Sequence, residues 1–314
     1  MMNGPCIKKA AARRFVLRPL IGILVLCAAA MPVACAPSKA KAANSAKSEK
    51  KTAASPTAAH VPVAEKPPAE TADMKKLTKL LSEPTLLFSD AKGEARPIVQ
   101  RISAQKELFL ADVQAVLAAD TEDLLIRVDK TVYLDSSYVP PALVPLTAES
   151  AKAGSYAISR GDLSLRAPVE KELARMAQAA REDGVTLLVS SSYRPYAYQK
   201  KVYERNVAQM GKEAADRESA RPGASQHQLG TVIDFGSISD AYAETKAGKW
   251  LYAHAGKYGW SLSFPDGYEF VTGYRWECWH YRYIGPLAVR FQEKWFNNVQ
   301  QYMIEFIHAW KKAD

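Results

Sequence analysis

The sequence is poor in cysteine, and three of its four cysteines stand near the N-terminus. Cys6, Cys27 and Cys35 fall within the first 35 of 314 residues, so Cys278 is alone in the remainder. If the first segment is removed or modified, no cysteine pair remains, which excludes a fold held by intrachain disulfides. The fold must therefore rest on a packed core, which a chain of this length with 48% hydrophobic residues can bury.

The chain also lacks a strong excess of one charge and a hydrophobic run of membrane-spanning length. The net charge is +9, and residues 1–35 carry five Lys or Arg and no acid, so the remainder carries 9 − 5 = +4. A charge of this size argues against nucleic acid as a partner. The longest apolar run, residues 20–33, is shorter than the ~20 residues that a transmembrane helix needs.

Residues 1–35 have the layout of a secretory signal peptide, because basic residues precede the apolar run. The run ends at Pro32-Val-Ala-Cys35, where small residues precede a cysteine, and this resembles a bacterial lipoprotein cleavage site. We expect Cys35 to be lipidated, with an ordinary secreted or uncleaved N-terminus as the alternative. The expected location is the cell envelope or periplasm, with a lipid anchor in the membrane.

The next segment, residues 36–73, is rich in Ala, Lys, Pro, Ser and Thr and predicts a disordered tether. Apolar residues at helical spacing then predict short helices within residues 74–120 and a final helix from Leu287 to Lys312. Between these helices, the apolar runs Leu124 to Val128 and Val185 to Ser190 predict strands.

The second of these strands leads into Ser191-Ser-Tyr-Arg-Pro-Tyr-Ala-Tyr-Gln199. Pro195 makes a continued strand unfavourable, so Arg194 is expected at a strand end or in a loop, where binding residues are common. Arg194 could hold a substrate carboxylate or support a developing oxyanion. A surface ion pair is the alternative.

Two polar clusters carry the residue types of a hydrolytic zinc site. In Ser225-Gln-His-Gln-Leu-Gly-Thr-Val-Ile-Asp234, Gly230 permits a turn after His227 and a strand from Thr231, so that His227 and Asp234 can converge. The second cluster supplies Glu277 and His280. Three protein ligands, an open position and a carboxylate base are the usual set for such a site, and Glu277 suits the base better than a fourth ligand.

Other candidates in the same region carry weaker signals. Cys278 could be a thiolate ligand, but a small buried residue is the favoured interpretation. His254 falls in a predicted helix, residues 247–258, and is interpreted as an ordinary histidine. Trp279 belongs to an alternating aromatic pattern that is typical of core packing and could also wall a groove.

Three motifs together resemble the VanY-type D-alanyl-D-alanine carboxypeptidases and their LD-carboxypeptidase relatives. They are Ser191 to Gln199, Ser219-Ala-Arg-Pro-Gly223 running into Ser225 to Gly230, and Glu277-Cys-Trp-His-Tyr-Arg-Tyr283. The resemblance covers about residues 120–290. It departs from the family pattern at Val232 and Cys278, which leaves ligands and base intact but affects the fine shape of the pocket.

The resemblance implies an α+β fold, in which a small, mainly antiparallel sheet carries a Zn²⁺ site and helices flank it. It implies His227, Asp234 and His280 as metal ligands, with Glu277 and Arg194 as catalytic residues. Gln199, Ser219, Ser225, Trp279 and Tyr193 are the candidate substrate-binding residues. The predicted domains are a zinc carboxypeptidase domain over residues 121–290, which the resemblance implies, and two parts predicted from apolar spacing, a helical N-terminal extension over 74–120 and a C-terminal helix over 291–314.

The expected function is removal of a C-terminal D-alanine from peptidoglycan stem peptides, with Glu277 assisting attack by a zinc-bound water. Both DD- and LD-carboxypeptidase activity are open, because the residues do not distinguish a pentapeptide from a tetrapeptide. An endopeptidase with the same metal centre is the first alternative. A non-catalytic envelope-binding lipoprotein is the second.

Overall fold

The computed structural model describes residues 70–83, 87–88 and 95–313. The expected signal peptide, the lipidation site at Cys35 and nearly all of the tether lie outside these residues. No helix among the described residues combines the length and the apolar character that crossing a membrane requires. The predicted domain boundaries stay a prediction.

A five-stranded sheet forms the centre of the described chain, and this confirms the α+β class. Its strands lie in the order β2, β4, β5, β7, β6, with β2 parallel to β4 and every other pair antiparallel. The strands are β2 (Ala157–Ile158), β4 (Leu188–Ser191), β5 (Val232–Phe235), β7 (His280–Tyr283) and β6 (Trp260–Leu262). A separate antiparallel pair joins β1 (Leu143–Pro145) to β3 (Ser164–Arg166).

Side-chain alternation gives the two faces of this sheet different chemistry. Ile233 and Phe235 on β5, together with Tyr281 and Tyr283 on β7, join a hydrophobic core with α6 (Ala167–Glu182). The other residues of the same two strands, which include Asp234 and His280, therefore point to the opposite face. Polar groups collect on that face.

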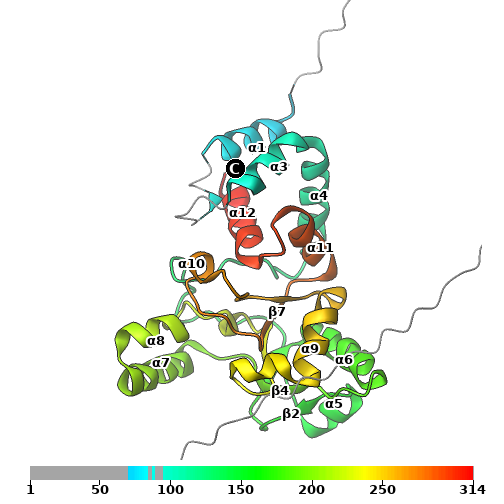
Figure 1. The fold of residues 1–314 in the computed structure, drawn as a ribbon, viewed down its shortest axis with the longest axis vertical. Helices are drawn as coiled ribbons and strands as arrows, with labels where there is room; N and C mark the ends of the chain where they lie inside the picture. Colours follow the sequence, from blue (N-terminus) through cyan, green and yellow to red (C-terminus); the bar gives the residue numbers. More distant parts are fainter. Residues whose placement is uncertain (1–69, 84–86, 89–94, 314) are drawn as a thin grey trace, which may run out of the picture. The chain divides into compact units, whose positions relative to one another are not determined.

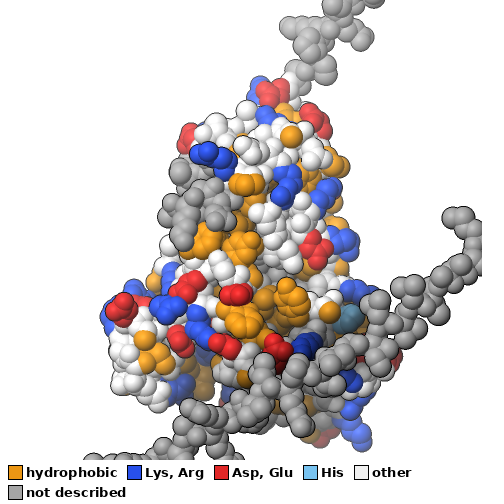
Figure 2. All heavy atoms as spheres, viewed as in Figure 1, with side chains coloured by type: hydrophobic (Ala, Val, Ile, Leu, Met, Phe, Trp, Pro, Cys, Tyr) orange, Lys and Arg blue, Asp and Glu red, His pale blue; other side chains and the backbone are white. Residues whose placement is uncertain are grey.

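Shorter helices surround the sheet and connect its strands. They are α5 (Ala148–Ala153), α7 (Tyr196–Met210), α8 (Lys212–Glu218), α9 (Lys246–His254) and α10 (Glu269–Thr272), with 3₁₀ turns η1 (Gln226–Leu229), η2 (Asp240–Glu244) and η3 (Ala255–Tyr258). Acidic and basic side chains lie interspersed over α7 and α8 on the face seen in Figure 2. Several are paired, as Asp216 is with Lys212 and Arg221.

Five helices from the two ends of the described chain pack together, and we call them the helical layer (Figure 1). They are α1 (Ala72–Ser82), α3 (Arg96–Ala104), α4 (Lys106–Ala119), α11 (Pro286–Trp295) and α12 (Gln300–Lys312). Their core is apolar and aromatic. Phe109 is its centre, since its ring lies 4.9 to 6.1 Å from four other aromatic rings.

The structure corrects two predictions about these segments. The final helix is not continuous, because Asn297 and Asn298 adopt positive φ values of 53° and 57° and separate α11 from α12. Residues 124–128 form no strand. The carbonyls of Leu124 and Ile126 instead accept hydrogen bonds from the buried guanidinium of Arg282, at 2.6 and 2.8 Å.

Candidate metal centre and catalytic cleft

The register of the sheet brings two of the predicted ligands together. Asp234 on β5 lies directly opposite His280 on β7, and Ser191 on β4 lies opposite Asp234. Directly opposed residues share one face of an antiparallel pair, with Cβ atoms about 5 Å apart. The two ligands therefore meet although 45 residues separate them in the sequence.

The third predicted ligand comes from the turn before β5. Ser225 begins η1, where its hydroxyl accepts from the backbone N–H of His227 at 3.3 Å. Gly230 then ends η1 with φ of +67°, a left-handed conformation that glycine adopts without strain. A side chain at this position would also meet Leu143 and Arg166 at 3.1 to 3.2 Å. The turn returns His227 toward Asp234, as the sequence predicted.

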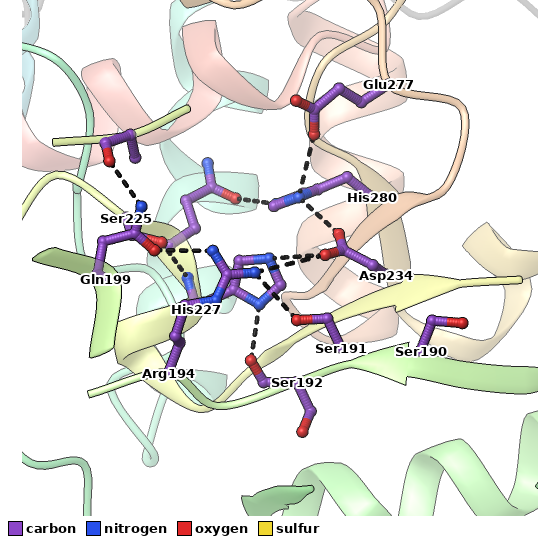
Figure 3. A network of polar contacts seen from close by, with 12 residues as sticks. Ser190, Ser191, Ser192, Arg194, Gln199, Ser225, His227, Asp234, Glu277 and His280 are labelled. Carbon is purple, nitrogen blue, oxygen red and sulfur yellow. Dashed lines mark hydrogen bonds and ion pairs between the residues drawn. The ribbon is translucent and has the colours of Figure 1, made fainter. Parts of the chain in front are cut away.

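His227, Asp234 and His280 offer ligand atoms that all lie within 4.8 Å of one another. Nε2 of His227 is 3.2 Å from Oδ2 of Asp234, and Nδ1 of His280 is 3.1 Å from Oδ1 (Figure 3). Oδ1 is buried but receives no hydrogen bond, because the His280 contact is not aligned for one. Two imidazoles and a carboxylate that converge in this way are the donor set of a catalytic zinc site.

The remaining ring nitrogen of each histidine has an acceptor beside it. Nδ1 of His227 lies 2.7 Å from the carbonyl of Ser192, and Nε2 of His280 lies 3.4 Å from Oε1 of Gln226. Each acceptor favours a proton on the nitrogen that it faces, and this leaves the other nitrogen free to bind metal. The tautomers therefore fit the donor set.

Burial and charge set the ionisation of the ligands. Burial, together with Arg194, lowers the pKa of His227 to about 4, so this ring is neutral at pH 7. Burial raises the pKa of Asp234, but the two imidazoles outweigh it and hold this pKa well below its usual range. Burial lowers the pKa of His280, but the carboxylates of Asp234 and Glu277 outweigh it and raise the value to about 9.

Glu277 lies beside the cluster without belonging to it. Its Oε2 atom is 3.4 Å from Nδ1 of His280, and its side chain is 12% exposed. Burial raises the pKa of Glu277, and the neighbouring His280 offsets part of this rise. A carboxylate with a raised pKa at the edge of a cleft is suited to proton transfer.

Arg194 follows β4 and faces the same cluster. Its guanidinium donates to Oε1 of Gln199 at 2.7 Å and to the Ser191 hydroxyl at 3.0 Å, and it lies 3.7 Å from Oδ2 of Asp234. Gln199 is held in turn by donating to the carbonyl of Ala220 at 2.6 Å. Arg194 is therefore a fixed, largely buried cation and not a member of a surface ion pair.

A cleft of about 390 Å³ opens onto these groups. Arg194, Ser219, Ser225 and Trp279 line it together with the three ligand residues and Glu277. Two of the predicted substrate-binding residues, Gln199 and Tyr193, are not part of the lining. Gln199 is fully buried and contacts the lining residue Arg194. Tyr193 lies near Tyr138, and its role stays a prediction.

Three residues of the site were not predicted from the sequence. Gln226 and the Ser192 carbonyl position the two histidine rings, as described above. Tyr274 lines the cleft with a 5% exposed side chain, and its hydroxyl is buried without a hydrogen-bond partner. The sequence signal for Gln226 was its place beside His227. Tyr274, three residues before Glu277, has no comparable signal.

The two weaker candidates lie away from the cluster. Cys278 is buried, and its thiol lies 3.6 Å from the carbonyl of Ser239, while burial raises its pKa. His254 is exposed at the end of α9 and stacks on Trp250. Neither residue is part of the group of converging ligand atoms.

Comparison with known proteins gives consistent matches to one family. The model of the VanY family, described as D-alanyl-D-alanine carboxypeptidase, matches residues 162–286. The putative carboxypeptidase YodJ of Bacillus subtilis (strain 168) is 31% identical over 192 residues, which cover 58% of this chain and 69% of the relative. The D-alanyl-D-alanine carboxypeptidase of Enterococcus faecium is 28% identical over 163 residues, and the match spans 51% of each chain.

Among solved structures, that of the LD-carboxypeptidase LdcB shares 29% sequence identity with this chain. The match covers 57% of this chain and 87% of that one, with a TM-score of 0.49. The helical layer lies mostly outside the residues that the family model matches, because α1, α3, α4 and α12 fall before residue 162 or after residue 286.

Proposed function

Since the chain belongs to the VanY family of D-alanyl-D-alanine carboxypeptidases, we propose that it is a zinc peptidase that removes a C-terminal D-alanine from peptidoglycan stem peptides. The observation that carries this proposal is the convergence of His227, Asp234 and His280 at the base of a cleft, with Glu277 beside them. These three side chains would hold the metal. Bound there, zinc would supply Lewis acidity, which activates water and polarises a carbonyl.

The proposed catalytic roles of Glu277 and Arg194 are proton transfer and charge stabilisation. Glu277 takes a proton from the attacking water as the new C–O bond forms at the scissile carbonyl. When the C–N bond breaks, Glu277 delivers that proton to the leaving amine. Arg194, held by Gln199 and Ser191, stabilises the negative charge that develops on the carbonyl oxygen or on the terminal carboxylate.

The remaining lining residues form the proposed binding surface for the peptide. Ser219 and Ser225 offer hydroxyl groups, and Trp279 offers an aromatic wall that is 4% exposed. A few well-placed polar groups beside an apolar wall are a common means of fixing the orientation of a small ligand.

A product-mass experiment tests the proposal. The full chain is incubated with zinc and two defined stem peptides, a pentapeptide ending in D-Ala-D-Ala and a tetrapeptide ending in one D-alanine. We expect loss of one alanine from at least one of them, and no cleavage after chelation. Cleavage at an internal bond would instead indicate an endopeptidase, and binding of peptidoglycan without cleavage would indicate an envelope-binding protein.

We also propose that the chain is exported and anchored by a lipid on Cys35. The support is the basic and apolar pattern of residues 1–35, which ends at small residues before that cysteine. The substrate also lies outside the cytoplasmic membrane. Growth with a labelled fatty acid should label the wild-type chain and leave Cys35→Ala unlabelled and in the soluble fraction. An unlabelled wild-type chain would contradict lipidation.

A further inference from the structure

A line of buried polar groups connects the helical layer to the predicted metal ligand His280. The Ser263 hydroxyl, just after β6, lies 2.8 Å from Oε1 of Gln226 and 3.3 Å from Oε1 of Gln300 at the start of α12. Oε1 of Gln226 in turn lies 3.4 Å from Nε2 of His280. Ser263 and Gln300 are 2% and 1% exposed, and Gln226 is 6% exposed.

Oε1 is the atom of Gln226 that faces both the histidine and the Ser263 hydroxyl. The single hydroxyl proton of Ser263 is donated mainly to this atom at 2.8 Å and is shared with Oε1 of Gln300 at 3.3 Å. The oxygen can only accept from Nε2 of His280, so the ring proton stays on Nε2. Nδ1, the atom beside Asp234, is then the nitrogen that would give up its proton to bind a metal.

Gln300 holds the other end of the line. Its Nε2 atom donates to the carbonyl of Ser261 at 3.3 Å, which ties the first turn of α12 to the edge strand β6. Ser263 lies two residues after Ser261, and Gln300 contacts both residues. The position of α12 therefore affects where the Ser263 hydroxyl lies. A polar side chain this deeply buried costs free energy unless it is hydrogen-bonded.

We propose that Gln300, Ser263 and Gln226 are positioning residues that set the tautomer and orientation of His280 for metal binding. The helical layer thus contributes to the metal site, although α12 lies outside the residues matched by the family model. This inference rests on the proposed metal site. The residues act through His280 and do not bind the metal themselves, although Gln226 also lines the cleft.

Neighbouring Gln292 offers a matched control. It is 2% exposed, lies on α11, and accepts from the Ser261 hydroxyl at 2.9 Å while donating to Asn298. It therefore joins the same helical layer to the same strand, but its hydrogen bonds in the described structure go to Ser261 and Asn298 and not to Ser263 or Gln226. Gln292→Leu should disturb packing about as much as Gln300→Leu and leave the line to His280 intact.

The experiment measures zinc affinity of the full chain by competition with a chromophoric chelator, together with the visible spectrum of the Co²⁺-loaded protein and the melting temperature. Ser263→Ala and Gln226→Leu should weaken zinc binding about 10- to 100-fold, and Gln300→Leu about tenfold. Gln226→Glu keeps the acceptor and should bind at least as tightly as the wild type. Gln292→Leu should match the wild type in zinc affinity and in Co²⁺ spectrum.

The outcomes separate this inference from the proposed function. If the wild-type chain binds no zinc, the metal site itself is wrong. If the wild type binds zinc and the Ser263→Ala, Gln226→Leu and Gln300→Leu proteins bind it as tightly as Gln292→Leu, the positioning role is wrong while the site stands. A loss of affinity in Gln292→Leu equal to that in Gln300→Leu would also overturn the inference, because general loosening of the layer would explain both.

Discussion

The cleft and the helical layer bury polar groups in opposite ways. In the cleft, Arg194, His227, Asp234, Glu277 and His280 are largely or fully buried within a few ångströms of one another. In the helical layer the interior is apolar. Its buried polar side chains lie at the boundary of the layer and contact the β6 region, the α11–α12 connection, or Asp129 and Arg127, and two of them also pair within α12. They are Gln292, Gln300, and the hydrogen-bonded pair Gln301 and Glu305.

This difference indicates where stability and chemistry are located. Clustering ionisable groups away from water is costly, and such clusters persist where a ligand or a reaction uses them. The helical layer follows the ordinary rule that burial of apolar surface stabilises a fold. Substitutions in the cleft should therefore change turnover more than stability, and substitutions in the apolar interior of the layer should do the reverse.

The largest effect is expected for Glu277→Ala. Removing the base should lower kcat about 10⁴-fold, about 5 kcal/mol of barrier, while the three ligand residues keep the metal. Alanine release and zinc content of the same sample check this. Glu269→Ala is the control, since Glu269 pairs with Arg217 outside the cleft. Near wild-type turnover in Glu277→Ala would remove Glu277 from the mechanism.

A similarly large effect, but on stability and not on turnover, is expected for Phe109→Ala. Its fully buried ring contacts Phe291, Trp295 and Phe306, so truncation should lower the free energy of unfolding by about 4 kcal/mol. Denaturant unfolding measures the loss. Turnover per folded molecule should stay within about twofold of the wild type, and a large fall would show that the two regions are not separable in this way.

Arg194→Lys should have a smaller effect on turnover. Lysine keeps the charge but cannot donate in the same fork to Gln199 and Ser191, so kcat/KM should fall about 100-fold. The melting temperature should change little. Steady-state kinetics with a D-alanine-terminated peptide check the fall, and an unchanged kcat/KM would reduce Arg194 to a structural role.

The smallest effect is expected for Asp129→Asn, a substitution between the two regions that should change the free energy of unfolding. Burial raises the pKa of Asp129, but hydrogen bonds from Thr131 and Arg127 outweigh it and lower this pKa below 3.8. The carboxylate therefore stabilises the fold fully above pH 3.8, and this contribution is lost as pH falls through the folded-state pKa. At pH 7, Asp129→Asn should lower the free energy of unfolding by about 2 kcal/mol, as measured by denaturant unfolding. The difference from the wild type should shrink below about pH 4.

Much of the candidate site could be predicted from local motifs. The glycine between His227 and Asp234, and the short spacing of Glu277 and His280, could be interpreted directly because turns depend on nearby residues. The run from Leu124 to Val128 was misinterpreted because apolar composition does not show that a distant arginine, Arg282, takes its carbonyls.

The strand register and the buried contacts between distant segments could not be predicted from local patterns. The convergence of Asp234 with His280 was expected only from the family resemblance, and the line from Gln300 through Ser263 to Gln226 joins three segments. A glutamine on a helix with apolar neighbours shows no sign of its partner. The break between α11 and α12 was also missed, because asparagine tolerates positive φ but does not require it.

Zinc content is the most direct test of the central claim, that His227, Asp234 and His280 form one metal site. The full chain is purified without added metal, loaded with zinc, desalted and analysed by elemental mass spectrometry, with Asp234→Ala and Glu277→Ala in parallel. We expect one zinc per chain in the wild type and in Glu277→Ala, and essentially none in Asp234→Ala. A zinc-free wild type, or one zinc retained by Asp234→Ala, would contradict it.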